Sequence, residues 1–219
     1  MGADVGVYET LGMIDIELYG GKRGFIEHLR ARGLYAISVH RQMGEIDWAA
    51  VTRLAFVCKG NICRSPYAAA RARSLGVPAV SFGLDAVNGT PADPAASRNA
   101  LVRGVDLSKH RSTRVESSAS FADGDLVVVF ELGQITEVRR RGGERIPLCL
   151  LGVWTKPLCP YIQDPYGRSD RYFQRCYSLI DANVSELVRR MVRGGSSVDP
   201  AGRFGSSEPT KESCNRKLP

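Results

Sequence analysis

Residues 57–67, with the sequence VCKGNICRSPY, hold the side chains of this chain that are best suited to chemistry. The apolar run LAFV precedes them and the run AAAR follows, an order that predicts a strand, a tight loop and a helix. A thiol, Cys58, then stands at the end of the strand, and Arg64 stands where the helix begins. Backbone N–H groups at a helix N-terminus gather positive potential at one spot, so the segment predicts an oxyanion cradle beside a sulfur nucleophile.

Each residue type inside this loop has a physical reason to be there. Gly60 is expected to take a positive φ and to let a ligand come close to the backbone. Asn61 tolerates the left-handed conformation and can brace the loop through its side chain. Arg64 presents a planar fork that matches two oxygens of a phosphoryl group. Ser65 suits a helix cap, and Pro66 suits the first turn, where its missing N–H is harmless.

The same donors would stabilise a thiolate on Cys58, because a site that attracts phosphate also attracts S⁻. The Cys-x5-Arg spacing is weak evidence by itself, since a chain with 6 cysteines and many arginines contains such pairs by chance. The apolar strand before the thiol, the Gly-Asn pair inside the loop and the Ser-Pro pair after it make the pattern specific. The competing interpretation is an ordinary buried cysteine beside a capped helix.

Residues 58–66 resemble the signature loop of the low-molecular-weight protein tyrosine phosphatases. The resemblance continues in the order of that family and covers about residues 51 to 192. The further segments that carry it are residues 81–94, 105–111, 125–130 and the Asp-Pro-Tyr triplet at 164–166.

This resemblance implies a protein-tyrosine phosphatase that works through a phosphocysteine intermediate. Cys58 would attack phosphorus, and Arg64 would hold the phosphoryl oxygens together with the loop amides. Asp164 would protonate the tyrosyl oxygen and then activate water, while Ser65 would help the thiolate to leave. The residues implied in phosphate or substrate binding are Lys59, Gly60, Asn61, Ile62, Cys63, Ser65 and Tyr166.

The resemblance also implies a hydrogen-bond network that holds the loop open, formed here by Asn61, Ser65, Ser81 and His110. Tyr166 would form one wall of the cleft and stack on the substrate ring. Simpler interpretations exist, because an Asp-Pro pair forms turns, a lone histidine is commonly structural, and Tyr166 could be a surface aromatic. The order of the segments favours the functional interpretation.

The chain departs from the family pattern at four positions that bear on substrate fit rather than on the chemistry. Phe82 stands where a small residue is usual, and Glu131 stands where the family tends to have Asp. Ala69 replaces a frequent Glu, and Gly167 takes the place of a second aromatic residue after Pro165.

Two positions bear on the substrate class. Members of the family that act on phosphotyrosine tend to carry Ile at the position of Ile62, whereas those that act on phosphoarginine tend to carry Thr. Val87 stands where animal members place an aromatic wall, which resembles the bacterial subgroup linked to capsule and exopolysaccharide production. The partner implied is a phosphotyrosine-bearing protein, with the tyrosine-rich tail of a membrane-bound tyrosine kinase as the candidate.

The alternation of apolar and amphipathic segments predicts an α/β fold. We expect a three-layer sandwich, in which a four-stranded parallel sheet has helices on both faces. The loops that carry Cys58 and Asp164 would then meet at the carboxyl edge of the sheet. Strands are expected near residues 53–58, 79–83, 125–130 and 145–150, and helices near 65–75, 94–104, 133–141 and 168–192.

Three regions follow from these boundaries. Residues 51–192 form the expected phosphatase domain. Residues 1–50 form an N-terminal extension of unknown role, with helical spacing within residues 24–32 and a strand or helix over 34–39. This extension would be either an extra helix on the core or an arm that docks a partner. Residues 193–219 are rich in Gly, Ser, Pro and charge, which predicts a disordered tail.

The charge and cysteine content of the chain argue against several other classes of function. The net charge of +7 suits anionic substrates, but the basic residues are scattered and form no nucleic-acid-binding motif. No segment reads as a membrane span or a secretory signal, which predicts a cytoplasmic protein. The 6 cysteines show neither a disulfide framework nor metal-ligand spacing, so neither a metal nor a cofactor is expected.

Three alternatives remain open at this point. An arsenate reductase of the same fold would need further redox cysteines, yet none lies between Cys63 and Cys149. A non-catalytic phosphotyrosine-binding module would have no need of an acid such as Asp164. A redox sensor would use Cys58 and Cys63, whose reversible disulfide would protect the nucleophile from over-oxidation.

Overall fold

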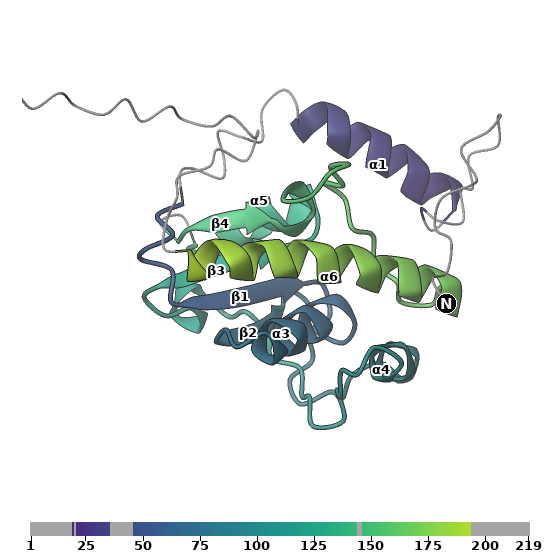
Figure 1. The fold of residues 1–219 in the computed structure, drawn as a ribbon, viewed down its shortest axis with the longest axis horizontal. Helices are drawn as coiled ribbons and strands as arrows, with labels where there is room; N and C mark the ends of the chain where they lie inside the picture. The colour runs from purple at the N-terminus through teal and green to yellow at the C-terminus, as the bar shows by residue number, and fades with distance from the viewer. Residues whose placement is uncertain (1–18, 20, 36–45, 144–145, 194–219) are drawn as a thin grey trace, which may run out of the picture.

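The computed structural model describes residues 19, 21–35, 46–143 and 146–193. Its centre is a four-stranded sheet in the order β2-β1-β3-β4, and every neighbouring pair of strands is parallel (Figure 1). This sheet confirms the predicted fold class. The strands are β1 (Arg53–Cys58), β2 (Ala79–Gly83), β3 (Asp125–Val129) and β4 (Leu148–Leu150).

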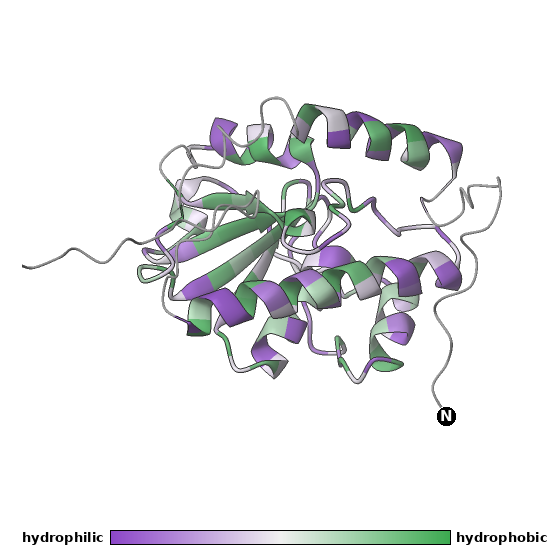
Figure 2. Ribbon diagram, turned by 45° about the horizontal axis from the view of Figure 1, so that its top comes forward, coloured by the Kyte–Doolittle hydropathy of each residue, from purple (hydrophilic) through white to green (hydrophobic). Residues whose placement is uncertain are grey.

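The two central strands are buried on both faces, which explains their unbroken apolar runs. Residues 54–57 of β1 and 126–129 of β3 have no exposed surface. Phe56 of β1 pairs with Ser81 of β2 on one side and with Val128 of β3 on the other. Figure 2 shows the strands in the colour of apolar residues, whereas the helices around them carry apolar and polar sides.

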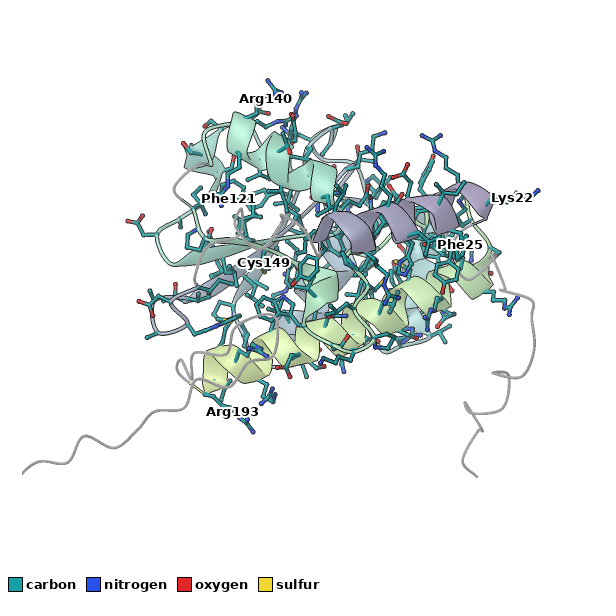
Figure 3. The ribbon with its side chains drawn as sticks, turned by 90° about the horizontal axis from the view of Figure 1, so that it is seen from above. Lys22, Phe25, Phe121, Arg140, Cys149 and Arg193 are labelled. Atoms are coloured by element: carbon teal, nitrogen blue, oxygen red, sulfur yellow. The ribbon has the colours of Figure 1, made fainter. Side chains whose placement is uncertain are left out.

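Helices cover the sheet on both faces. Figure 3 shows α5, which carries Arg140, on one side of the sheet and α6 on the other, with Cys149 of β4 between them. On the face of α6, the rings of Tyr67 in α3 and Tyr177 stack with centroids 3.7 Å apart. The helices are α1 (Lys22–Leu34), α3 (Arg64–Ser74), α4 (Pro94–Leu101), α5 (Leu132–Arg140) and α6 (Asp170–Val192).

The predicted boundaries differ from the observed ones by a few residues. The helix expected over 94–104 ends at Leu101, because the chain turns through Gly104, whose φ is 71°. The strand expected over 145–150 begins at Leu148. The tail expected over 193–219 lies outside the described residues except for Arg193, and so do residues 36–39 of the segment 34–39, whose first residue, Leu34, ends α1. None of the described helices is long and apolar enough to cross a membrane.

Helix α1 packs on the loop that leads to Asp164. A Cβ atom on Gly24 would lie 1.8 Å from the carbonyl oxygen of Tyr19 and 1.9 Å from the side-chain amide of Gln163. Only a glycine permits this approach. Figure 1 shows α1 on the opposite side of the sheet from α4. The N-terminal extension therefore contacts the residue that directly precedes the expected general acid.

One ion pair joins the two central strands at their amino ends. Arg53 Nε and Nη2 donate to Asp125 Oδ1 and Oδ2 at 2.6 and 2.8 Å, and the Asp125 side chain is fully buried. The register of β1 on β3 places these two residues opposite each other. Asp125 also accepts the N–H of Ala122 at 2.9 Å, so its charge is satisfied on two sides.

Replacing Arg53 by Met should destabilise the fold, because it leaves the Asp125 carboxylate buried without a counter-charge. We expect the free energy of unfolding to fall by about 3 kcal/mol, measured by urea denaturation. Arg140→Met is the matched control, since the pair of Arg140 with Glu137 is on the surface. Equal shifts of the urea midpoint in the two variants would contradict a structural role for the Arg53–Asp125 pair.

Candidate active site

The loop between β1 and α3 owes its shape to Asn61. This residue is fully buried with a φ of 54°, and it is the only residue other than glycine with positive φ in the described part of the chain. The positive φ predicted for Gly60 was wrong, because Asn61 takes the left-handed position one residue later. A Cβ on Gly60 would meet the Ile62 side chain at an ordinary 3.5 Å. The glycine that the loop requires is Gly83, where a Cβ would lie 2.8 Å from the Asn61 nitrogen.

Asn61 ties the loop to two other segments. Its Nδ2 donates to Ser65 Oγ at 2.8 Å, and its Oδ1 accepts the backbone N–H of Thr113 at 2.8 Å. Its carbonyl oxygen lies 2.7 Å from His110 Nε2, which must carry the proton to donate there. Burial lowers the pKa of His110, opposed in part by this hydrogen bond, and favours a neutral ring.

Ser65 faces the thiol rather than capping the helix. Helix α3 begins at Arg64, and the capping position is occupied by Cys63 without a side-chain hydrogen bond, so the predicted cap was wrong. Ser65 Oγ instead lies 3.0 Å from Cys58 Sγ and 3.1 Å from the carbonyl oxygen of Phe82. A hydroxyl has one proton, and Ser65 can direct it to the Phe82 carbonyl or to the sulfur.

The structure does not bring Ser81 into this network. Ser81 lies in β2, and in the part of the chain that the structure describes its side chain forms no hydrogen bond to the loop. The contribution of β2 comes from the backbone carbonyl of Phe82. Backbone carbonyls are available at every residue, so no side-chain motif could have identified this contact.

Arg64 is the most buried cation of the site, with 1% of its surface exposed. Its Nη1 donates to the carbonyl oxygen of Ile162 at 2.8 Å and to Glu131 Oε1. Its Nη2 lies 3.0 Å from Asp164 Oδ2, and the guanidinium sits 5.5 Å from the centre of the Phe130 ring. Burial alone would lower the pKa of Arg64, but the two carboxylates outweigh it and raise the pKa.

One edge of Arg64 forms no hydrogen bond. Within the described residues, neither Nε nor Nη2 makes a hydrogen bond, although both atoms are buried and Nη2 forms an ion pair with Asp164 at 3.0 Å. These two groups lie on one edge of the guanidinium and form the fork that binds two oxygens of a phosphoryl group. Buried donors without acceptors are costly in a folded protein, so this edge of Arg64 indicates a site for an oxyanion.

The two cysteines of the loop have different environments. Cys58 lies at the end of β1 beside Ser65, and both cysteines are free and buried. Burial, followed by the carboxylates of Asp164 and Asp93, raises the pKa of Cys63 far above its usual value. Cys63 is therefore held as a thiol, which leaves Cys58 as the candidate nucleophile.

The acid and the aromatic residue of the Asp-Pro-Tyr triplet meet the loop across a cleft. The cleft has a volume of about 260 Å³. Its lining includes the expected nucleophile and acid, and consists of Cys58, Lys59, Gly60, Ile62, Cys63, Asp85, Asp164 and Tyr166. The Asp164 side chain is 35% exposed, and Tyr166 is 62% exposed at the mouth. Of the predicted site residues, Gly60 contributes backbone alone, and the Ser81 side chain forms no hydrogen bond to the loop in the described part of the chain.

The sequence identified Glu131 only as a departure from a pattern, yet its carboxylate contacts Arg64. Glu131 follows β3 at the carboxyl edge of the sheet, the position at which such sheets place functional residues, so its position contained a usable signal. No cluster of three or more His, Cys, Asp or Glu side chains among the described residues could hold a metal ion.

A thiol at the end of a central parallel strand, facing a buried arginine fork and a carboxylic acid, defines the class of cysteine-dependent phosphatases. Residues 53–197 match the family described as low molecular weight phosphotyrosine protein phosphatase, and the chain belongs to this family. The match begins at β1, so α1 lies before it.

Known relatives agree with this assignment. EpsP of Ralstonia nicotianae is 33% identical over 138 residues, covering 62% of this chain and 92% of EpsP. The low molecular weight protein-tyrosine-phosphatase Etp of Escherichia coli K12 is 31% identical, covering 63% of this chain and 93% of Etp.

Solved structures share the fold. The tyrosine phosphatase AmsI of Erwinia amylovora superposes with a TM-score of 0.59 at 30% identity, covering 64% of this chain and 92% of AmsI. The arginine phosphatase YwlE of Geobacillus stearothermophilus has a TM-score of 0.58 at 24% identity, covering 65% of this chain and 94% of YwlE. The likeness to YwlE shows the fold alone.

Removing the Asn61 side chain should weaken oxyanion binding. Asn61→Gly keeps the left-handed backbone accessible but loses two hydrogen bonds of about 1 kcal/mol each, so we expect the Kd for phosphate to rise about ten-fold or more. Asn61→Ala should weaken binding further, because it adds backbone strain. Isothermal titration measures both. Asn88→Gly is the control, since Asn88 accepts the N–H of Arg114 outside the loop; equal weakening in the control would contradict the bracing role.

Proposed function

We propose that this chain hydrolyses phosphotyrosine in proteins through a phosphocysteine intermediate on Cys58. The observation that carries the proposal is the edge of Arg64 formed by Nε and Nη2, two buried donors that make no hydrogen bond in the described structure, although Nη2 also pairs with the Asp164 carboxylate. This edge supports the binding of two phosphoryl oxygens next to Cys58 and Asp164. Family membership supports the same chemistry.

In the first step, the Cys58 thiolate attacks phosphorus opposite the tyrosyl oxygen. The bond between phosphorus and the tyrosyl oxygen breaks as the S–P bond forms, and Asp164 gives its proton to the leaving oxygen. Arg64 and the backbone N–H groups of the loop hold the three equatorial oxygens, where the negative charge spreads.

In the second step, water attacks the phosphocysteine. Asp164, now a carboxylate, takes a proton from this water as it bonds to phosphorus, and the S–P bond breaks. The leaving sulfur recovers its negative charge 3.0 Å from Ser65 Oγ, which can turn its proton from the Phe82 carbonyl to the sulfur. Ser65 would therefore stabilise the thiolate as it forms.

The lining of the cleft favours an aryl phosphate. Ile62 presents an apolar side chain in the loop, and the exposed ring of Tyr166 stands at the mouth, where it can stack on a substrate ring. Ile62 is also the residue that the resemblance associates with phosphotyrosine rather than phosphoarginine. These features favour tyrosine over arginine as the phosphorylated residue.

We further propose that residues 51–192 act as the phosphatase domain of a cytoplasmic enzyme of capsule or exopolysaccharide production. The segment around Val87, which resembles that subgroup, and the similarity to EpsP, Etp and AmsI support this role. Its substrate would be the tyrosine-rich tail of a membrane-bound tyrosine kinase.

Replacing Cys58 by Ser should abolish turnover while leaving the oxyanion site intact. We expect kcat on a phosphotyrosine peptide to fall by about 10⁴-fold or more, because the serine hydroxyl is a far weaker nucleophile. The Kd for phosphate should stay within a few-fold of wild type. Phosphoserine and phosphoarginine peptides serve as substrate controls. Substantial turnover by Cys58→Ser would refute the covalent mechanism, and no turnover by wild type would leave the phosphotyrosine-binding module as the better interpretation.

Replacing Asp164 by Asn should affect poor leaving groups most. An amide cannot donate a proton to the tyrosyl oxygen, so we expect kcat/KM on phenyl phosphate to fall by about 10² to 10³-fold. Aryl phosphates with acidic phenols need less protonation, so their kcat/KM should fall far less. The slope of log kcat/KM against leaving-group pKa measures the difference, and an unchanged slope would argue against the acid role.

A further inference from the structure

A second cleft of about 510 Å³ extends from the cradle towards α1. Its lining includes Arg64 and Asp164 of the cradle together with Arg23 of α1. Lys59 of the loop and Arg168, which follows the Asp-Pro-Tyr triplet, also line it. Three segments that are distant in the sequence thus bring cations to one space beside the reacting groups.

The charges in this cleft do not balance. Its lining holds four cations, on Arg23, Lys59, Arg64 and Arg168, and two carboxylates, on Glu131 and Asp164. Both carboxylates are bound to Arg64. No ion pair holds the other three cations within the described residues. The lining of the cleft therefore carries a net positive charge, and Arg23, Lys59 and Arg168 have no carboxylate of the lining as an ion-pair partner.

Tyr161 also lines this cleft. Burial and the carboxylates of Glu131 and Glu27 raise the pKa of Tyr161 to about 12, while the charges of Arg64 and Arg23 both act in the opposite direction. The two guanidiniums therefore act on the same phenol. Because Arg64 and Arg23 line the same cleft, a peptide whose phosphotyrosine binds Arg64 would have a neighbouring side chain in the space that Arg23 lines.

Gln163 holds this arrangement in place. Its side chain is buried, and the amide orientation that satisfies both of its neighbours has the nitrogen donating to the carbonyl oxygen of Tyr19 at 2.5 Å and the oxygen accepting from Arg168 Nη2 at 3.1 Å. Gly24 of α1 lies directly against the same amide. One glutamine thus fixes Arg168 and the amino end of α1 relative to Asp164, the next residue in the chain.

We propose that the part of this cleft lined by Arg23 and Arg168 is a subsite for an acidic group that neighbours the phosphotyrosine in the substrate. The subsite rests on the proposed phosphatase function and adds a substrate preference to it. Its ligand is a carboxylate of Asp or Glu, or the phosphoryl group of a second phosphotyrosine on the same peptide. Arg23 lies before residue 53, where the family match begins, so the subsite includes a contribution from the N-terminal extension.

The test compares three peptides that differ only in the residues next to the phosphotyrosine. These neighbours are neutral in the first peptide and glutamates in the second. In the third, the neighbour is a phosphonate analogue of phosphotyrosine, which the thiol cannot cleave. The wild type should show a kcat/KM at least about five-fold higher on an acidic peptide, mainly through KM, and this ratio should shrink with added salt. Arg23→Glu and Arg168→Glu should each reduce the ratio to one or below. Preference for the glutamate or the phosphonate peptide identifies the source of the anion.

Arg30→Glu is the matched control, because Arg30 is an exposed arginine of α1 that does not line the cleft. It should keep the ratio of the wild type. Equal kcat/KM on all three peptides, or the same loss of ratio in Arg30→Glu, would overturn the subsite. Turnover of p-nitrophenyl phosphate, which has no neighbouring group, reports the cradle alone. If the wild type does not hydrolyse p-nitrophenyl phosphate, the phosphatase function itself is overturned.

Discussion

The buried guanidinium of Arg64 is the constraint on which the rest of the site depends. A cation with 1% of its surface exposed is stable only with counter-charges and hydrogen bonds around it. Glu131 at the end of β3, the Ile162 carbonyl and Asp164 supply them from two segments. Because Arg64 itself begins α3 directly after the loop of Cys58, satisfying this one charge brings the nucleophile, the acid and the oxyanion donors together.

The shape of the loop beside Arg64 is defined by contacts within the protein itself. Asn61 stays in the left-handed conformation because its side chain and carbonyl are bonded to Ser65, Thr113 and His110. Gly83 allows the loop to lie directly on β2. Donors that are already oriented need no reorganisation when charge develops on the phosphoryl oxygens, which is the main electrostatic advantage of such a site. The strained backbone at Asn61 is thus maintained by folding contacts rather than by the substrate.

The sequence predicted those features of the structure that depend on the local order of apolar and polar residues. Apolar runs predicted all four strands, and the sheet topology then required the segments of Cys58 and Asp164 to meet at one edge. The sequence-based predictions were wrong where contacts between distant segments determine the local conformation. The positive φ at Asn61 depends on Thr113, and the orientation of Ser65 depends on the Phe82 carbonyl. The packing of α1 depends on the fit of Gly24 against Gln163, for which no pattern in either segment gives a signal.

The placement of charge in the site reconciles two opposing requirements. Arg64 needs Glu131 and Asp164 to be stable when buried, yet these carboxylates repel the dianionic phosphate that the cradle must attract. A net charge of +7 attracts anions to the whole protein, but salt screens it over about 10 Å. Cations that line the cleft without contacting the carboxylates restore a positive potential at short range. Lys59, Arg168 and Arg23 are in that position, so the extension that precedes the family domain contributes to the electrostatics of the site itself.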